Sequence, residues 1–208
     1  MHRRLALAVF LSSSGASAHA APTIEPVPGA PSLTTRTNAD ATHCGGFDVT
    51  VRASRDAKSL EPELVAALTL DAPRGLDFDP DHAKAQAASV KRFGAWFADA
   101  MATLDKAHKR YEARAADTSL VPAARVEAIA RLVQLDRRFA DVLARMEIPR
   151  SVRTGPYAAD ATVTFCDTLA EKAQPLIDRA DKTAETCRKV AADAKLGPSW
   201  WTDVCKAP

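Results

Sequence analysis

The stretch RFGAWFADAMATLDKAHKRYEARAAD, residues 92–117, decides the fold. Its apolar side chains recur at alternating spacings of four and three, at Phe93, Phe97, Ala100, Leu104, Ala107 and Tyr111. Because an α-helix turns once in about 3.6 residues, this spacing places them on one face. The pattern therefore predicts a long amphipathic helix that begins near Asp81, as its N-cap, and ends at 117–119.

The next segment predicts a second helix that pairs with the first. It begins at Pro122, which a first turn tolerates, and stops before Pro149. Its apolar face comprises Ala128, Leu132, Leu135, Phe139, Val142 and Met146. A short connection between two amphipathic helices is typical of an antiparallel hairpin.

A third helical region follows Gly155-Pro156 and contains an internal proline. Its apolar positions are Tyr157, Ala161, Phe165, Leu169 and Ala173, then Leu176, Ala180, Thr183, Cys187 and Val190. Pro175 removes a helical hydrogen bond, which predicts that residues 158–195 are either sharply kinked or split into two helices. The fold class predicted for residues 81–208 is all-α, with antiparallel helical hairpins arranged as in tetratricopeptide repeats or as a bundle.

The chain before residue 81 gives weaker patterns. Residues 61–70 predict a short helix with Pro62 in its first turn, and the alternation of Phe47, Val49 and Val51 predicts a short strand. Residues 44–80 are otherwise expected to be irregular, within a single domain that spans 44–208. Residues 21–43 carry four prolines and predict a flexible lead-in.

Residues 1–20 have the pattern of a cleavable signal peptide. Arg3 and Arg4 precede an apolar run, and small residues at Ala18 and Ala20 fit cleavage before Ala21. That apolar run is too short to span a bilayer, and no later stretch approaches the roughly 20 apolar residues that a spanning helix needs. We expect a periplasmic or secreted protein without a transmembrane segment.

Four cysteines, at 44, 166, 187 and 205, allow three disulfide pairings in an oxidising compartment. On one straight helix Cys166 and Cys187 would lie about 30 Å apart, so only a hairpin near Pro175 would let them pair. Cys187 and Cys205 close a short loop through Gly197-Pro198, which makes them the favoured pair. Cys44 with Cys166 then follows by elimination.

Charge and motifs favour binding to protein over other functions. The chain has 28 Lys and Arg against 26 Asp and Glu, and the signal carries two of the basic residues. The mature charge is therefore near zero, which argues against nucleic acid as a partner. Phosphate-binding loops and the common hydrolase motifs are missing from the sequence, so no cofactor and no catalytic residue is predicted.

Metal binding is also not predicted. Asp77, Asp79 and Asp81 match the first positions of a calcium loop, but His82 and Ala88 stand where that loop needs Gly and Glu. We interpret the cluster as a capped helix start. The histidines at 43, 82 and 108 are too dispersed to suggest a ligand set.

Three tryptophans and their neighbours are interpreted as packing residues. Trp200-Trp201 lies beside Cys205 and is expected to cover the disulfide, although an exposed aromatic anchor is the alternative. Phe93, Trp96 and Phe97 are interpreted as core and not as a cofactor site. The acids Asp141 and Glu147 are expected on polar faces with basic neighbours.

Four segments of the chain also resemble a known family. They are residues 92–117, RLVQLDRRFADVLARMEIP at 131–149, YAADATVTFCDTLAEKAQPLIDRADKTAETCRKV at 157–190 and WWTDVC at 200–205. Their order and spacing resemble the C-terminal part of large secreted tetratricopeptide-repeat proteins of gliding deltaproteobacteria. The residues that carry the resemblance are Tyr111, Arg138-Phe139-Ala140-Asp141, Ile148-Pro149, 169–176 with Pro175, Cys187, Trp201 and Cys205.

The resemblance implies a stack of helical hairpins in the periplasm, and some members of that family serve gliding motility. A solenoid needs about three or more repeats, and no 34-residue repeat array is evident before residue 80. We therefore expect a terminal module, in which a Cys44–Cys166 clamp replaces the missing neighbouring repeats.

The sequence thus predicts a non-enzymatic, exported helical protein that binds an unknown protein partner or serves as a scaffold, as part of an envelope complex. One alternative is a structural envelope factor without a partner groove. The other is an enzyme, which would need a pocket that gathers polar groups, for instance acids near Arg137 or His108.

Overall fold

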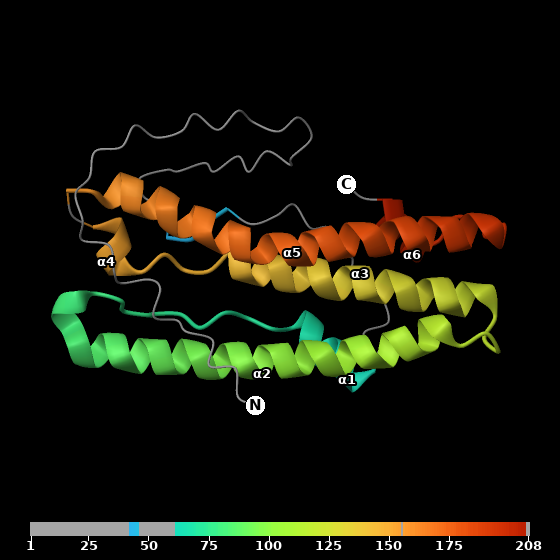
Figure 1. The fold of residues 1–208 in the computed structure, drawn as a ribbon, viewed down its shortest axis with the longest axis horizontal. Coiled ribbons are helices and arrows are strands. Elements are labelled where there is room, and N and C mark those ends of the chain that lie inside the picture. Colours follow the sequence, from blue (N-terminus) through green and yellow to red (C-terminus); the bar gives the residue numbers. More distant parts are fainter. Residues whose placement is uncertain (1–41, 46–60, 155, 207–208) are drawn as a thin grey trace. The chain divides into compact units, whose positions relative to one another are not determined.

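Helices α2 (Ala83–Ala116) and α3 (Pro122–Ala144) form the predicted antiparallel hairpin (Figure 1). The computed structural model describes residues 42–45, 61–154 and 156–206. Within this part of the chain, helices account for 77% of the residues, and the fold is all-α as predicted. The only β pairing among the described residues is an isolated bridge between His43 and Glu147.

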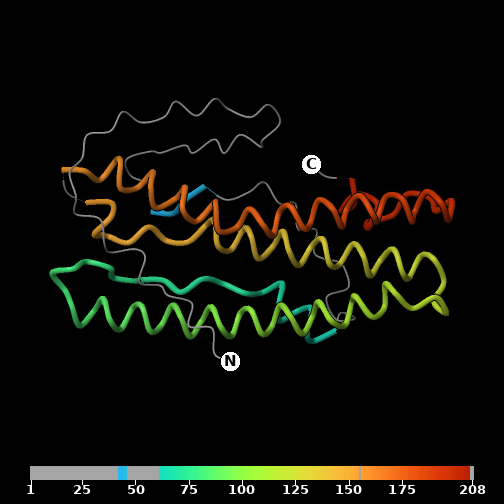
Figure 2. Tube along the Cα trace, viewed as in Figure 1, coloured from blue at the N-terminus to red at the C-terminus, as the bar shows by residue number. Residues whose placement is uncertain are grey.

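Helix α3 is the centre of the arrangement. It packs against α1 (Pro62–Leu68), α2, α5 (Ala158–Asp193) and α6 (Trp200–Lys206), and the tube in Figure 2 shows it running between α2 and α5. Because neighbours surround it, α3 is buried on nearly every side, including five of its polar or charged residues. A short helix α4 (Arg150–Arg153) leads from α3 towards α5.

Helix α5 meets α3 through a face of small side chains. Its buried residues are Cys166, Ala170, Ala173, Ile177, Ala180, Ala184, Cys187 and Ala191. Since the distance between packed helices depends on the side chains at the contact, this face lets α5 lie close along α3. Larger buried side chains come from the other elements, such as Phe139 of α3, Leu104 of α2 and Leu64 of α1.

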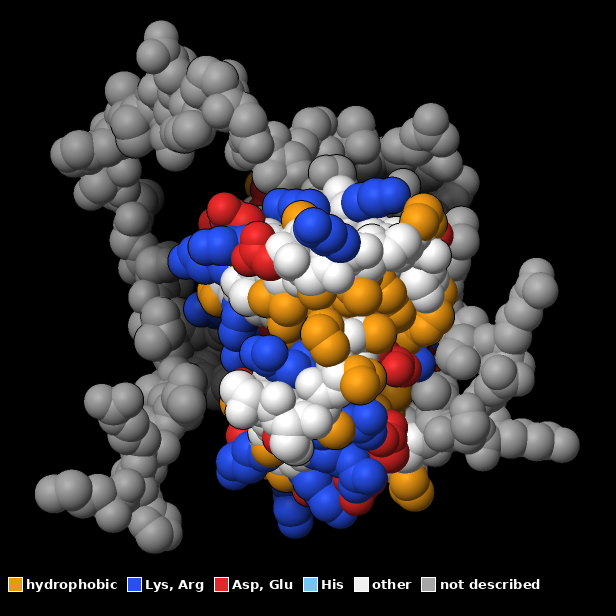
Figure 3. Space-filling model, turned by 90° about the vertical axis from the view of Figure 1, so that its right-hand side faces the viewer, with side chains coloured by type: hydrophobic (Ala, Val, Ile, Leu, Met, Phe, Trp, Pro, Cys, Tyr) orange, Lys and Arg blue, Asp and Glu red, His pale blue; other side chains and the backbone are white. Residues whose placement is uncertain are grey.

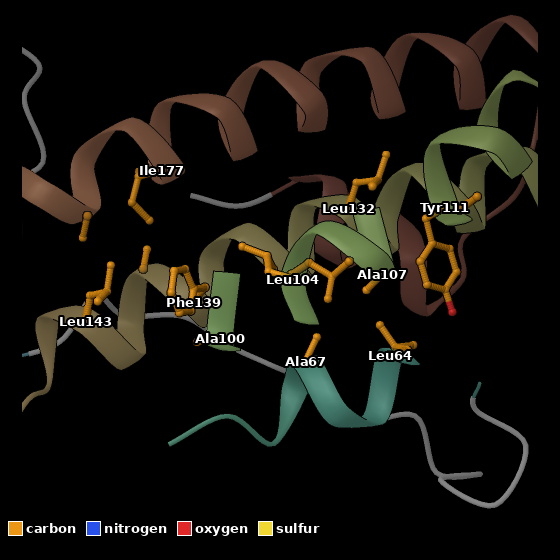
Figure 4. Packing of buried hydrophobic residues seen from close by; sticks show 14 residues of the cluster. Leu64, Ala67, Ala100, Leu104, Ala107, Tyr111, Leu132, Phe139, Leu143 and Ile177 are labelled. Atoms are coloured by element: carbon orange, nitrogen blue, oxygen red, sulfur yellow. The ribbon is translucent and has the colours of Figure 1, made fainter. Parts of the chain in front are cut away.

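The main core cluster joins four helices (Figure 4). Phe139, Leu135 and Leu132 of α3 meet Leu104 and Tyr111 of α2. Helix α1 contacts both α2 and α3 and points Leu64 and Ala67 into the same cluster, and both are almost completely buried. The short helix predicted at 61–70 is therefore a structural part of the core.

The structure corrects three details of the predicted helices. Asp81 is not the N-cap of α2, because it lies inside the 3-10 turn η3 (Pro80–His82), which Asp79 caps through Asp81 N. Pro175 does not split the third helix, since α5 continues through it. Phe97 and Tyr157 are exposed, so the apolar spacing there does not mark buried positions.

Both predicted disulfides are present. Cys44–Cys166 and Cys187–Cys205 have Cα atoms 5.5 and 5.8 Å apart, within the usual range for disulfides. Two disulfides fit an extracellular or periplasmic protein. No helix in the described ranges is long and apolar enough to cross a membrane. The predicted signal peptide, the lead-in at 21–41 and the strand positions Phe47, Val49 and Val51 lie outside the described residues.

Candidate functional site

The Cys187–Cys205 disulfide anchors α6 to α5 at one end of the hairpins. Trp201 and Val204 of α6 are buried in one cluster with both cysteines and with Val126 of α3. Arg137 donates to the carbonyl of Val204, and Arg188 donates to the carbonyl of Cys205. The disulfide and these hydrogen bonds fix the short α6 helix in place.

This end also carries an exposed apolar surface, which we call the end surface and define as Val121, Val190, Leu196 and Trp200. Val121 is 66% exposed, while the other three are partly buried against the cluster below. Figure 3 looks onto this end and shows apolar side chains gathered in a band, with both basic and acidic side chains around it. Trp200 is held by Arg131, whose guanidinium carbon lies 4.0 Å from the ring centroid.

A fully buried carboxylate, Asp136, joins three helices. It accepts hydrogen bonds from Arg179 Nε of α5, at 2.7 Å, and pairs with His108 Nε2 of α2, at 2.8 Å. The bond to Asp136 raises the pKa of Arg179 above its ordinary value, so the guanidinium remains charged. The other ring nitrogen of His108 lies 3.6 Å from the Glu112 carboxylate. Both nitrogens thus face acids, an arrangement that suits a clamp between helices.

A charged cavity of about 330 Å³ lies at the opposite end of α3. Among the residues that line it are Asp141, Glu147, Arg138 and Arg145, so the structure brings together the two acids that the sequence placed on polar faces with basic neighbours. Asp141 is buried, contrary to that expectation, but its basic neighbours are present. Arg145 Nε lies 2.6 Å from one of its oxygens, and Arg138 Nη1 lies 3.4 Å from the other.

The remaining polar groups of this cavity hold the chain between α1 and α2. Arg138 donates to the carbonyls of Leu68 and Leu70, and Glu147 accepts from Gly75 N at 2.6 Å. Gly75 has φ of +61°, a conformation that glycine adopts without strain. Asp141, Glu147, Arg138 and Arg145 are therefore engaged in contacts with other parts of the protein.

No group of three or more His, Cys, Asp or Glu in the described part of the chain is placed to hold a metal ion. The three dispersed histidines contact different residues, and no contact joins one of them to another in the described part of the chain. His82 pairs with Asp77, His108 with Asp136, and His43 with Thr42. Asp77 also accepts from Asp79 N, so the acidic run has the local capping role that the sequence suggested.

Sequence reasoning missed Asp136 and Arg179. Asp136 lies next to Leu135 and three residues before Phe139, and these two apolar residues belong to the predicted buried face of α3. The position of a charged residue beside that face was the only indication in the sequence that Asp136 is buried. This position alone did not predict burial, because no neighbouring helix was predicted on the other side of α3. No protein family, curated protein or solved structure that was compared matches the chain.

Proposed function

We propose that this chain is an exported, non-enzymatic helical protein that binds another protein through the end surface. The observation that carries the proposal is the 66% exposure of the apolar Val121 at an end of the molecule on which Figure 3 shows a band of apolar side chains. Contiguous apolar surface on a soluble domain commonly marks an interaction site. The disulfide and the buried Trp201 hold the band in one conformation, so little ordering is needed on binding.

The surroundings of the band indicate the chemistry of the partner. Lys189 and Lys195 are exposed next in sequence to Val190 and Leu196, and Arg131 lies against Trp200. Arg131 itself is buried and Asp193 is exposed between the two lysines, so the rim carries charges of both signs. An apolar centre with such a rim fits a protein surface that has apolar side chains surrounded by charged groups of both signs. Aromatic and Arg side chains are also the residues most often dominant in binding energy.

The contacts of the acidic groups support binding over catalysis. Asp136 is saturated by His108 and Arg179, and Asp141 is held by two arginines. A general acid or base must be able to reach a substrate, and these carboxylates face protein cations instead. The proposal extends to a terminal module of a tetratricopeptide-type envelope assembly, on the strength of the sequence resemblance alone.

Co-purification with matched variants tests the binding role. Val121→Asp places a charge in the apolar band, whereas Tyr157→Asp changes a residue of similar exposure, 77%, near the start of α5. We expect the wild-type chain and Tyr157→Asp to retain one specific partner from the periplasmic or secreted fraction, and Val121→Asp to lose about tenfold or more of it. Recovery of no specific partner, or equal recovery by all three proteins, would contradict the proposal.

A further inference from the structure

The first half of α2 is an apolar helix that has no neighbour on most of its surface among the residues that the structure describes. Residues 83–102 contain only four charged side chains, at Lys84, Lys91, Arg92 and Asp99. Yet only Ser89 and Ala100 of this stretch are buried. In the second half of the same helix Leu104, Ala107, His108 and Tyr111 are buried against the rest of the fold.

One face of this half combines exposed apolar side chains with a glycine. We call it the α2 face and define it as Ala87, Val90, Gly94, Phe97, Ala98 and Met101, which lie within about one third of the helix circumference. Val90 is 39% exposed, and Phe97 and Met101 are exposed to nearly the same degree. The Phe97 ring also stacks with Phe93 and contacts Phe139, so the face is fixed to the core from behind.

No packing contact within the described part of the chain requires a glycine at position 94. Gly94 is exposed in the first half of α2, and a Cβ added there would meet nothing within 4 Å. Glycine is a poorer helix former than alanine, so its presence weakens the isolated helix. A glycine in a helix allows close approach of another backbone, as at helix crossings.

From these observations we infer that the α2 face binds the α2 face of a second copy in an antiparallel crossing centred on Gly94. In that arrangement residues equally distant from Gly94 lie opposite each other. Met101 of one copy then meets Ala87 of its partner, and Val90 meets Ala98, so that large side chains face small ones. A parallel pairing would put Met101 against Met101 and leave a gap between the two alanines.

The charges at the ends of the face agree with the antiparallel orientation. Lys84 stands ten residues before Gly94, and Asp105 stands eleven residues after it. An antiparallel crossing brings the ammonium of one copy towards the carboxylate of the other at both ends, whereas a parallel one places like charges together. Asp105 already pairs with Lys109 at the surface, and it is exposed enough to accept a second cation.

Disulfide trapping tests the geometry. All four native cysteines are bonded, so an introduced cysteine supplies the only free thiol. Under mild oxidation Gly94→Cys is expected to form covalent dimers with itself. Ala87→Cys is not, because two copies of residue 87 would lie about 20 Å apart along antiparallel helices. A mixture of Ala87→Cys and Met101→Cys is expected to form mixed dimers. Self-linking of Ala87→Cys, or no linking of Gly94→Cys, would overturn the inference.

Sedimentation equilibrium of the intact mature chain supplies a second measurement. Wild-type protein is expected to dimerise, and Met101→Asp to weaken dimerisation by about tenfold or more because a charge would be buried in the crossing. The control is Val163→Asp on α5, a residue with the same 39% exposure as Val90, which should leave the dimer intact. A wild-type monomer at all concentrations would overturn the inference. Recovery of a partner protein by the Val121 variants is a separate measurement, so the proposed partner binding and the proposed dimer can each fail without the other.

Discussion

At the scale of single residues, Asp136 shows how this fold accommodates a charge inside a helical core. Its carboxylate is completely buried, and desolvation of an unpaired ion there would be very unfavourable. Arg179 and His108 supply the compensating hydrogen bonds from two different helices. The cluster therefore fixes the positions of α2 and α5 relative to α3, because neither helix can slide without breaking a buried bond.

Asp136→Asn is expected to lower the free energy of unfolding by about 2 kcal/mol, since the neutral amide loses the charge-assisted hydrogen bonds that the buried carboxylate makes with His108 and with the half-exposed Arg179. Asp105→Asn is the control, because Asp105 forms an exposed pair with Lys109 that should be worth about 0.5 kcal/mol or less. Urea unfolding followed by circular dichroism measures both. Equal losses would show that Asp136 has no special structural role.

Glu61 is expected to make stability depend on acid pH. Burial raises its pKa, but hydrogen bonds from Tyr111 and its own backbone, with Arg114 and Arg110 nearby, outweigh burial and leave the pKa below the ordinary 4.5. Burial also raises the pKa of Tyr111, so the phenol remains a donor. Because the unfolded chain then binds the proton more readily, the stability from Glu61 is present above pH 4.5 and is lost as the pH falls through its lower folded-state pKa.

Glu61→Gln should therefore reduce stability at pH 7 and flatten the fall in stability between neutral pH and pH 3. Thermal unfolding at a series of pH values measures the effect, with the exposed Glu185→Gln as the control. A variant that keeps the full acid dependence of the wild type would show that Glu61 is not its source.

At the scale of elements, α5 is a long helix that contains an unfavourable residue. Pro175 is exposed and removes one backbone hydrogen bond from the middle of the helix. The small residues on the α3 side of α5 keep it continuous through tertiary packing, which overrides the local preference to break. This is why the split that the sequence allowed does not occur.

Pro175→Ala is expected to raise the free energy of unfolding by about 1–3 kcal/mol, because alanine restores the hydrogen bond and is the better helix former. Guanidinium unfolding provides the measurement, with the exposed Lys172→Ala in the same helix as the control. Destabilisation would mean that the local geometry imposed by the proline is needed for packing against α3.

The apolar spacing in the sequence predicted the buried residues correctly wherever another helix packs against the apolar face. The positions Leu132, Leu135 and Phe139 are buried as their spacing predicts. Phe97 satisfies the same spacing and is exposed, because periodicity shows which residues share a face but not whether another element covers it. Asp136 escaped prediction for the converse reason, since its partners His108 and Arg179 come from helices distant in the chain.

At the scale of the whole molecule, the two disulfides connect regions that helix packing alone would leave apart. Cys44–Cys166 joins residues 122 positions apart and attaches the segment around Cys44 to α5, whereas Cys187–Cys205 spans 18 positions. Loop geometry and elimination were sufficient to predict both pairs. Which parts of the fold the disulfides stabilise, including the end surface, could be identified only from the folded structure.

Replacing Cys44 and Cys166 with serine is expected to cost about 5 kcal/mol, against about 3 kcal/mol for the same change at Cys187 and Cys205, because the longer loop restricts the unfolded chain more. Chemical unfolding of the two double variants gives the comparison. A larger loss for the shorter loop would indicate that Cys187–Cys205 acts mainly through native packing around Trp201.

Contact with another protein through the end surface is the central claim for the molecule. It is tested most directly by a photo-reactive amino acid introduced at Val121 in the exporting cell, with the same group at Tyr157 as the control. We expect irradiation to produce one discrete, heavier adduct from position 121 and none from position 157. No adduct at position 121, or the same adducts from both positions, would contradict the claim.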